Sequence, residues 1–254
     1  MEDVILYEQD GHVVTLTINR PAQMNALNTA VRQGLFDGFE RFEQDADARV
    51  AILTGAGERA FCAGMDLKEA AEMALAVPPR GFLPILGDTI HVTKPVIAAV
   101  NGVAFAGGWL LAQMCDLCIA SESATFGITE ARVGRGMGWA PPLIHMIPQR
   151  VMLELLMTAK PITAQRAYEI GFVNHVVAPG QVLPRAREMA ADIVANAPLT
   201  VAAVKEMVMA ATDMGRSAAL RAGANIFEKV YLSEDAIEGP KAFREKRRPN
   251  WKGE

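Results

Sequence analysis

Residues 101–110 read Asn-Gly-Val-Ala-Phe-Ala-Gly-Gly-Trp-Leu, and this stretch decides how the chain is expected to fold. It follows a short apolar run at 95–100, turns at Asn101-Gly102, and then reaches Gly107 and Gly108, where a helix is expected to begin. The first turn of a helix leaves backbone N–H groups without partners inside the helix. The stretch therefore predicts a buried strand, a turn and a helix N-terminus with free N–H groups.

A second segment, residues 61–67, has the same character and reads Phe-Cys-Ala-Gly-Met-Asp-Leu. Its small residues lead into an expected helix, with Asp66 near the N-cap. Two such helix ends that converged would form a pocket for negative charge developing on a carbonyl oxygen, and glycine would let the backbone approach closely. Ordinary tight packing around small residues explains the same pattern, so the spacing alone leaves both interpretations open.

The composition indicates a globular protein in a reducing compartment, so we expect a cytoplasmic location. The chain has 254 residues and only three cysteines, and so few cysteines argue against a disulfide framework. Its net charge of −4 argues against nucleic acid as the main partner. The acidic start Met1-Glu2-Asp3 does not resemble a signal peptide. The most apolar stretch, 95–112, is interrupted by proline and glycine, so we expect no membrane span.

The pattern of apolar residues predicts strands that alternate with helices, followed by helices alone. This is an α/β fold, with a core over 1–196 and a C-terminal helical region over 197–254. Residues 75–93 have the weakest pattern and are expected to form a loop or short helix near the surface. The expected strands are 4–7, 13–18, 50–54, 95–100, 117–120 and 124–126, and the expected helices are 28–42, 67–74, 108–115, 140–158, 164–170, 182–196, 198–211 and a last segment from 216.

Two short motifs are better explained by structure than by ligand binding. Residues 55–60 match the dinucleotide pattern G-x-G-x-x-A, but the expected second strand ending in an acidic residue is missing, so a glycine-rich turn is favoured. Cys115 and Cys118 lack a second ligand pair, and the four histidines are scattered. We therefore expect no metal site and no bound cofactor.

The motifs taken together resemble the enoyl-CoA hydratase/isomerase (crotonase) superfamily. The matching stretches cover nearly the whole chain in order, and they are 19–27 (Asn-Arg-Pro through Asn-Ala-Leu), 63–67, 101–102 with 106–108, 126–127 with Glu130, and 238–247. The resemblance implies a spiral of β-β-α turns, with C-terminal helices that build a homotrimer or a hexamer made of two trimers.

The resemblance also implies an acyl-CoA substrate whose thioester oxygen is held by the backbone N–H groups of Met65 and Gly107. Binding the oxygen in this way stabilises an enolate, and no metal is required. Phe243 and Lys246 match an aromatic residue and a lysine that family members use near the nucleotide, although a solvated cationic helix end explains them equally well. The remaining residues implied in substrate or CoA binding are Ala22, Asn25, Ala26, Leu27, Ala63, Asp66, Leu67, Gly108, Trp109, Leu110 and Trp139.

The sequence departs from typical hydratases of the family, which use two glutamates to hold one water molecule. Glu130 matches one of them, but Leu110 stands at the position of the other. A single carboxylate can remove a proton at one end of an allylic system and return it at the other, which resembles the Δ3,Δ2-enoyl-CoA isomerase branch. Apolar neighbours such as Leu110, Trp109 and Trp139 would raise the pKa of Glu130.

Isomerisation is therefore the leading hypothesis, with hydration of a 2-enoyl-CoA as the alternative. A non-catalytic CoA- or RNA-binding scaffold is disfavoured by Glu130, by the two matched oxyanion positions and by the acidic pI of about 5.7. Arg135 lies in a segment that differs from the common form and suggests an acidic acyl group. An unchanged preference for neutral acyl chains in Arg135→Ala would contradict that suggestion.

Overall fold

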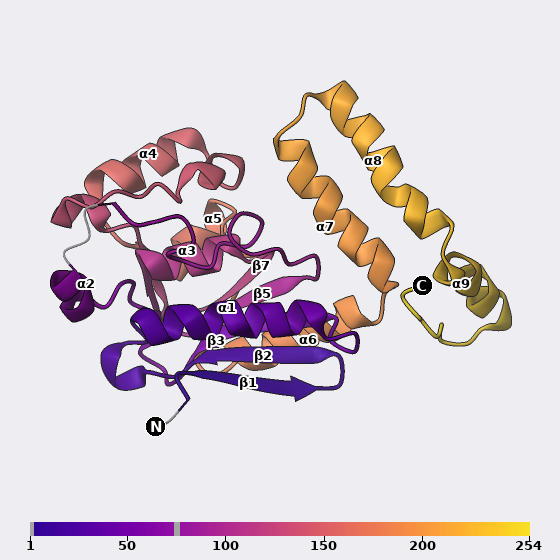
Figure 1. Ribbon diagram of the computed structural model, residues 1–254, viewed down its shortest axis with the longest axis horizontal. Coiled ribbons are helices and arrows are strands. Elements are labelled where there is room, and N and C mark those ends of the chain that lie inside the picture. The colour runs from indigo at the N-terminus through magenta and orange to yellow at the C-terminus, as the bar shows by residue number, and fades with distance from the viewer. Residues whose placement is uncertain (1–2, 74–76) are drawn as a thin grey trace.

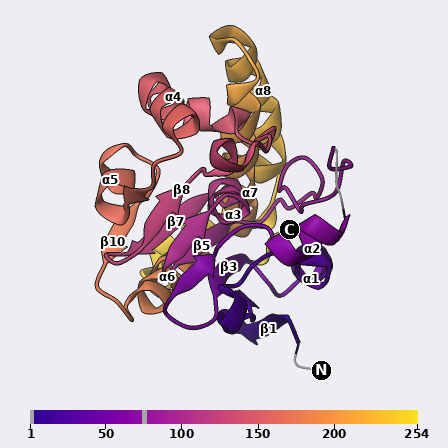
Figure 2. The same ribbon diagram turned by 90° about the vertical axis from the view of Figure 1, so that its left-hand side faces the viewer.

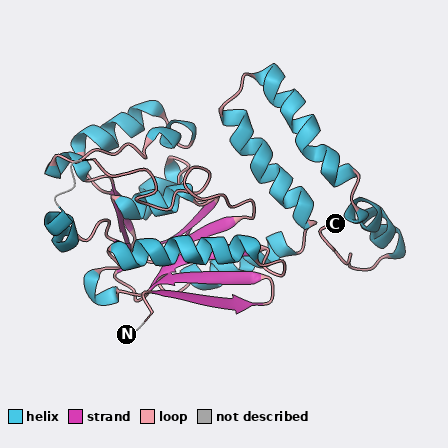
Figure 3. Ribbon diagram, viewed as in Figure 1, coloured by secondary structure: helices cyan, strands magenta, loops and turns pink. Residues whose placement is uncertain are grey.

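A computed structural model gives the structure of the protein, and it describes residues 3–73 and 77–254. Two β-sheets with surrounding helices form the body of the molecule, and three helices extend from it (Figures 1 and 3). The first sheet has the order β1-β2-β3-β5-β7-β10, with β1 and β2 antiparallel and the others parallel. Its strands are β1 (Ile5–Asp10), β2 (Val13–Ile18), β3 (Val50–Gly55), β5 (Val96–Val100), β7 (Leu117–Ser121) and β10 (His175–Val177).

The second sheet is built from very short strands, and it carries the segments predicted to form the site. Its order is β4-β6-β8-β9, over Ala60–Cys62, Val103–Phe105, Thr125–Gly127 and Ile162–Thr163. Helices α1, α3, α5 and α6 pack against the sheets, and α2 and α4 lie farther out. They are α1 (Thr29–Gln44), α2 (Leu67–Met73), α3 (Gly107–Met114), α4 (Gln149–Thr158), α5 (Ala164–Glu169) and α6 (Val182–Val194).

The central strands are apolar on both faces because helices cover both sides of the first sheet. All six residues of β3 and all five of β5 are buried. Alternate side chains of a strand point to opposite faces, so Ile52 and Ile97 pack against α6, while Leu53 belongs to the larger core that includes α1. Figure 2 shows these strands between α1 on one side and α6 on the other.

The C-terminal helices project from the core as a hairpin followed by a third helix (Figure 1). They are α7 (Pro198–Thr212), α8 (Arg216–Tyr231) and α9 (Glu234–Glu245). An ion pair of 2.9 Å between Lys205 and Asp116 ties α7 to the core, and the indole N–H of Trp251 donates to the carbonyl of Ala195 at 2.8 Å. In the described part of the chain no single helix is long and apolar enough to cross a membrane, and the pair α6–α7 passes that test only together, across a bend of 107°.

Most elements expected from the sequence are confirmed. The hairpin turns at Gly11, Asn28 caps α1 by accepting from the N–H of Val31 at 2.9 Å, and Gly171 follows α5 with a φ of 89°. The single helix expected over 140–158 is wrong, because prolines divide it into a 3₁₀ segment, Pro141–His145, and α4. Residue 74 of an expected helix and residues 75–76 of the expected loop lie outside the described residues. The boundary expected at 196/197 stays a prediction.

Candidate active site

The segment around Met65 is held by a single parallel bridge to Leu27. The N–H of Leu27 donates to the carbonyl of Gly64 at 2.8 Å, and the N–H of Asp66 donates to the carbonyl of Leu27 at 3.1 Å. These two bonds use the residues on either side of Met65 and leave its own N–H unused. Successive N–H groups of an extended chain point in opposite directions, so the N–H of Met65 points away from Leu27. Gly64 permits this path with a φ of 94°.

The second segment reaches the same place from β6 and opens helix α3. Ala106 has a φ of 52° and a ψ of −116°, a strained conformation for a residue other than glycine, and its N–H donates to the carbonyl of Gly127 at 2.8 Å. Helix α3 then begins at Gly107, so the N–H of Gly107 has no partner within the helix. The strained turn directs the start of α3 toward the Met65 segment.

The two segments are in contact, and glycine is what allows it. A methyl group placed on Gly107 would lie 2.8 Å from Cδ1 of Leu27 and 3.6 Å from Cα of Gly64. A methyl group on Gly64 would lie 2.9 Å from Cβ of Ala106. The structure therefore brings the two sequence-predicted N–H donors to one place, as a pocket for a thioester oxygen requires.

Glu130 follows β8 and is buried close to this junction. The preceding strand, β8, is paired with β6, so that Gly127 lies opposite Phe105. Glu130 comes three residues after Gly127, at the start of a short 3₁₀ segment. Only 8% of Glu130 is exposed, and its Oε2 atom has no hydrogen-bond partner among the described residues. Burial raises the pKa of the Glu130 carboxyl above its ordinary value. Hydrogen bonds from its own backbone, from the Trp139 side chain and from the backbone of Thr129 lower this pKa, but by less than burial raises it. A raised pKa suits a group that must both accept and return a proton.

Two predicted pocket residues on α3 have different positions. Leu110 lies one turn after Gly107 and therefore on the same face of the helix, and only 1% of it is exposed. Trp109 is two residues from Gly107, which turns it to the opposite side, where its ring centroid lies 4.7 Å from that of Phe172 and 5.8 Å from that of Phe126. The expectation that Trp109 lines the substrate pocket is thereby corrected, because it is a fully buried core residue.

Asn25 is also corrected, from a CoA contact to a structural residue. Its side chain is fully buried, accepts from the N–H of Arg20 at 3.0 Å and donates to the carbonyls of Ala56 and Ala60 at 3.0 and 2.7 Å. It also has a φ of 55°, which asparagine tolerates better than most residues. Both the oxygen and the nitrogen of the Asn25 side-chain amide are therefore hydrogen-bonded to backbone, and this amide holds the turn that precedes Leu27.

We expect Asn25→Ala to lower the free energy of unfolding by about 2–4 kcal/mol, because buried carbonyls lose their donor. Urea denaturation monitored by circular dichroism measures this change. Asn19→Ala is the control, because Asn19 makes one exposed bond, from its side-chain N–H to the carbonyl of Asp3. A loss below about 0.5 kcal/mol in Asn25→Ala, typical of surface positions, would contradict the structural role.

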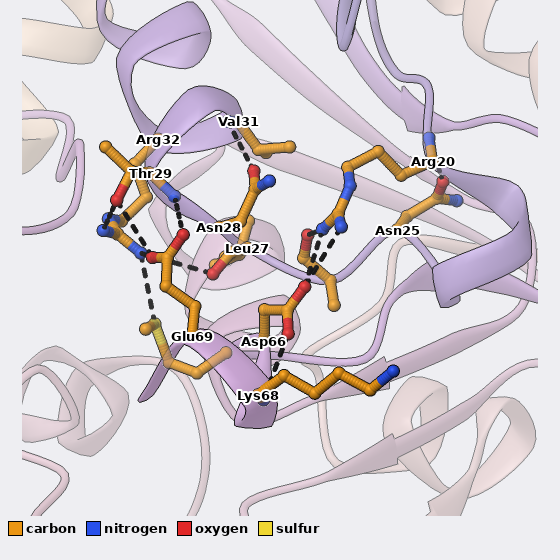
Figure 4. A network of polar contacts seen from close by, with 12 residues as sticks. Arg20, Asn25, Leu27, Asn28, Thr29, Val31, Arg32, Asp66, Lys68 and Glu69 are labelled. Carbon is orange, nitrogen blue, oxygen red and sulfur yellow. Dashed lines mark hydrogen bonds and ion pairs between the residues drawn. The ribbon is translucent and has the colours of Figure 1, made fainter. Parts of the chain in front are cut away.

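Of the other residues expected to contact CoA, several are accessible. Ala22 and Leu67 are exposed, while Ala26, Ala63 and Asp66 are partly exposed. Asp66 caps α2 and receives two bonds of 3.1 Å from the guanidinium of Arg20 (Figure 4). Leu27 is fully buried and its backbone N–H and carbonyl are both hydrogen-bonded, so it can contribute only by shaping the site. The CoA contacts themselves stay predictions.

Phe243 and Lys246 are not brought to this site within one chain. Both belong to the end of α9, which lies at the opposite end of the long axis from α2 in Figure 1. Phe243 is 88% exposed. Arg247, in the same basic run, forms ion pairs with Glu238 and Glu245. A contact of α9 with bound CoA would therefore require another copy of the chain.

Other clusters in the described residues lack the chemistry of this junction. No group of three or more His, Cys, Asp or Glu residues there could hold a metal ion, and burial raises the pKa of Cys118 to about 12. A cleft of about 330 Å³ lies at the carboxyl edge of the first sheet, away from Met65, Gly107 and Glu130. Gly55 and Gly57 of the rejected dinucleotide pattern line it.

Comparison with known proteins assigns the chain to a family. A family model described as enoyl-CoA hydratase/isomerase matches residues 8–254. The chain belongs to the enoyl-CoA hydratase/isomerase family. Among curated relatives, this family member is 42% identical to enoyl-CoA hydratase EchA19 of Mycobacterium tuberculosis, over 97% of this chain and 95% of the relative. It is 40% identical to carnitinyl-CoA dehydratase of Salmonella arizonae, over 100% of both.

Solved structures give the same assignment for the fold. Enoyl-CoA hydratase EchA1 from Mycobacterium marinum superposes with a TM-score of 0.93 at 39% identity, covering 100% of both chains. A probable enoyl-CoA hydratase/isomerase from Mycobacterium abscessus gives 0.90 at 43% identity, with the same coverage. This member of the enoyl-CoA hydratase/isomerase family therefore has the α/β crotonase fold, and it is an enzyme of CoA-thioester metabolism.

The sequence interpretation missed the arginines that hold the Met65 segment. Arg32 is 5% exposed and continues the buried stripe of α1 formed with Leu35, Phe39 and Phe42. A charged residue at that apolar spacing was a usable signal, because buried arginine needs a partner. Its partner Glu69 comes from α2, and no local pattern indicates that pairing.

Proposed function

We propose that this enzyme shifts the double bond of an enoyl-CoA and that Glu130 is its only proton-transferring group. The proposal is supported by the buried carboxylate of Glu130, by the contact between the Gly64 and Gly107 segments, and by Leu110 on the Gly107 face of α3. Leu110 stands at the position where typical hydratases of the family have the second glutamate of the water-binding pair. One acid/base group favours proton return over water activation.

The chemistry follows from one base and one oxyanion pocket. The Glu130 carboxylate removes a proton from C2 of a 3-enoyl thioester, and the electron pair spreads over a dienolate. The N–H groups of Met65 and Gly107 bind the oxygen on which negative charge develops. The protonated Glu130 then delivers the same proton to C4, which leaves the double bond between C2 and C3. Atoms balance without water or an added oxidant.

Addition or removal of water is the second candidate, and the names of the relatives favour it. Enoyl-CoA hydratase EchA19 and the carnitinyl-CoA dehydratases are about 40% identical to this chain over nearly its whole length. Both names describe reversible hydration chemistry at a CoA thioester. Glu130 would then act on a water molecule without help from position 110.

Products separate the two candidates directly. The protein is incubated with 3-enoyl-CoA and with 2-enoyl-CoA, and mass spectrometry and chromatography follow the products. Conversion of the 3-enoyl to the 2-enoyl isomer without gain of water supports isomerisation. Rapid gain of water by 2-enoyl-CoA, with slow isomerisation, would reject it in favour of the hydratase.

We also propose that the enzyme acts in the cytoplasm without a metal or cofactor.

We propose further that the active form is a homotrimer or a hexamer of two trimers. In the hairpin α7–α8 the side chains of Val208 and Leu220 are 50% and 68% exposed, and α9 lies far from the site of its own chain. Light scattering after gel filtration should give three or six times 27.4 kDa. A monomer would reject the assembly, and loss of activity after dialysis against a chelator would reject the metal-free mechanism.

A further inference from the structure

Arg32 on α1 makes several contacts with residues next to Met65, among them Leu27 and Glu69 (Figure 4). Its Nη1 atom lies 3.0 Å from Oε1 of Glu69, donates to the carbonyl of Leu27 at 3.3 Å and lies 4.0 Å from Sδ of Met65. Its Nη2 atom donates to the hydroxyl of Thr29 at 2.7 Å. One buried side chain thus connects α1, α2 and both partners of the bridge that orients Met65.

Glu69 completes the connection from the side of α2. Its carboxylate accepts from the N–H of Thr29 at 2.8 Å and from the hydroxyl of Thr29 at 3.0 Å, at the first residue of α1. A carboxylate is favoured at the positive end of a helix. Burial alone would raise the pKa of Glu69, but the Thr29 hydrogen bonds and the charge of Arg32 lower it. Glu69 is therefore held as an anion that fixes α2 against α1.

The same guanidinium also holds the segment that follows α2. Its carbon lies 4.2 Å from the ring centroid of Phe82, in the stacking position that arginine favours over aromatic rings. Arg32 thereby contacts the chain before α2 through Met65, α2 itself through Glu69, and the loop beyond it through Phe82. Burying an arginine is costly unless its geometry is fixed by several partners, and two of these partners, Leu27 and Met65, form the bridge at the proposed site.

The side chain of Met65 packs against the larger core, and hydrogen bonds of its neighbours fix its backbone. The bridge to Leu27 contains two hydrogen bonds, and helix α2 begins two residues after Met65. Arg20 supports Asp66 on the far side, through two bonds of 3.1 Å. Displacing catalytic groups by about 1 Å can reduce the rate about 100-fold, so the support of a single backbone N–H affects the chemistry.

We propose that Arg32, through Glu69 and Leu27, is a positioning residue for the oxyanion-binding N–H of Met65. This inference rests on the proposed function, because it takes the Met65 N–H as a donor to the thioester oxygen. It requires no choice between isomerisation and hydration, since both place negative charge on that oxygen. Without Arg32 the Met65 segment and α2 would move away from Leu27, and the oxygen would lose one of its two donors.

The test uses the carbonyl of a bound substrate as a direct reporter. A saturated acyl-CoA labelled with ¹³C at the thioester carbonyl is bound to the full chain, and isotope-edited infrared spectroscopy records its stretching frequency. Hydrogen bonds to the oxygen lower that frequency. We expect a shift to lower frequency with the wild type and loss of at least half of that shift in Arg32→Met, which keeps an apolar stem but removes every N–H donor.

Kinetics should separate positioning from binding. We expect Arg32→Met to lower kcat about 10- to 100-fold while KM changes less than about three-fold, because the hydrogen bond from the Met65 N–H strengthens as negative charge develops on the oxygen in the transition state. Arg32→Lys should recover part of both signals, since it restores the charge opposite Glu69 but not the planar fork. Arg41→Met is the control, because Arg41 lies on the same helix and stacks 3.7 Å from the Tyr7 ring centroid, away from Met65.

The outcomes are distinguishable. A folded Arg32→Met variant with the wild-type carbonyl shift and kcat would overturn the positioning role. If Arg32→Met does not fold, Glu69→Gln decides instead, since it removes the ion pair and leaves Arg32 in place. An unchanged carbonyl shift in folded Glu69→Gln would overturn the role as well. No carbonyl shift in the wild type would refute the oxyanion pocket, and with it the proposed function.

Discussion

Glu130→Gln is expected to lower kcat for enoyl-CoA conversion by about 10³-fold while KM stays within a few-fold of the wild type. The amide cannot remove a proton, but it has nearly the same shape as the carboxyl group, so binding should persist. Steady-state kinetics measures both constants. Glu122→Gln, an exposed glutamate that follows β7, is the matched control. Activity within ten-fold of the wild type in Glu130→Gln would show that another group transfers the proton.

The pH dependence of the wild type should report the same carboxyl group. Burial raises the pKa of Glu130, and only its deprotonated form can remove a proton. Activity should therefore rise with pH through a pKa above the ordinary value of 4.5 for a glutamate. A profile of kcat/KM whose acid limb falls at or below that value would contradict the assignment.

Stability should change in the opposite direction to activity. A carboxyl group with a raised pKa in the folded protein binds more protons there than in the unfolded chain. The free energy of unfolding then falls as pH rises from the unfolded pKa through the folded pKa. Glu130→Gln removes this penalty, so the variant should be more stable than the wild type at neutral pH. The difference should disappear below the ordinary value of 4.5.

Long apolar runs and helix caps made most of the first sheet and α1 predictable from the sequence. The strands β3 and β5 are buried on both faces, which leaves uninterrupted apolar runs, and Asn28 marks the start of α1. The second sheet was not predictable in full, because its strands have only two or three residues. Such strands have no measurable period, and they exist because distant segments pair with them.

The candidate site divides in the same way. The glycine-rich segments at Gly64 and Gly107 were predictable, because the residue types within each segment indicate a turn and the start of a helix without knowledge of distant contacts. Trp109 was misplaced because its position relative to Gly107 depends on the face of α3, and the sequence interpretation did not use that periodicity. The Arg32–Glu69 ion pair joins residues 37 positions apart, and only the fold brings them together.

Gly108→Ala is expected to destabilise the protein by more than about 3 kcal/mol and to remove activity even where the fold survives. An added methyl group would lie within van der Waals overlap of the Cys62 backbone, 2.8 Å from its carbonyl carbon. The nearest atoms are the backbone of Cys62, which cannot give way as the end of a flexible side chain can, so α3 must move away from β4. That movement would carry Gly107 away from Gly64 and open the junction that holds the two N–H donors.

Gly223→Ala gives the contrast within the same protein. Gly223 lies inside α8, where a methyl group would be 3.7 Å from Cγ of Met207, an ordinary contact. Alanine favours a helix interior over glycine, so this variant should be more stable by about 0.5–1 kcal/mol and fully active. Thermal and urea unfolding with steady-state kinetics would compare the pair. Equal stabilities for the two variants would mean that α3 does not need glycine for its approach to Cys62, and the close convergence of the two oxyanion segments would have to be rejected.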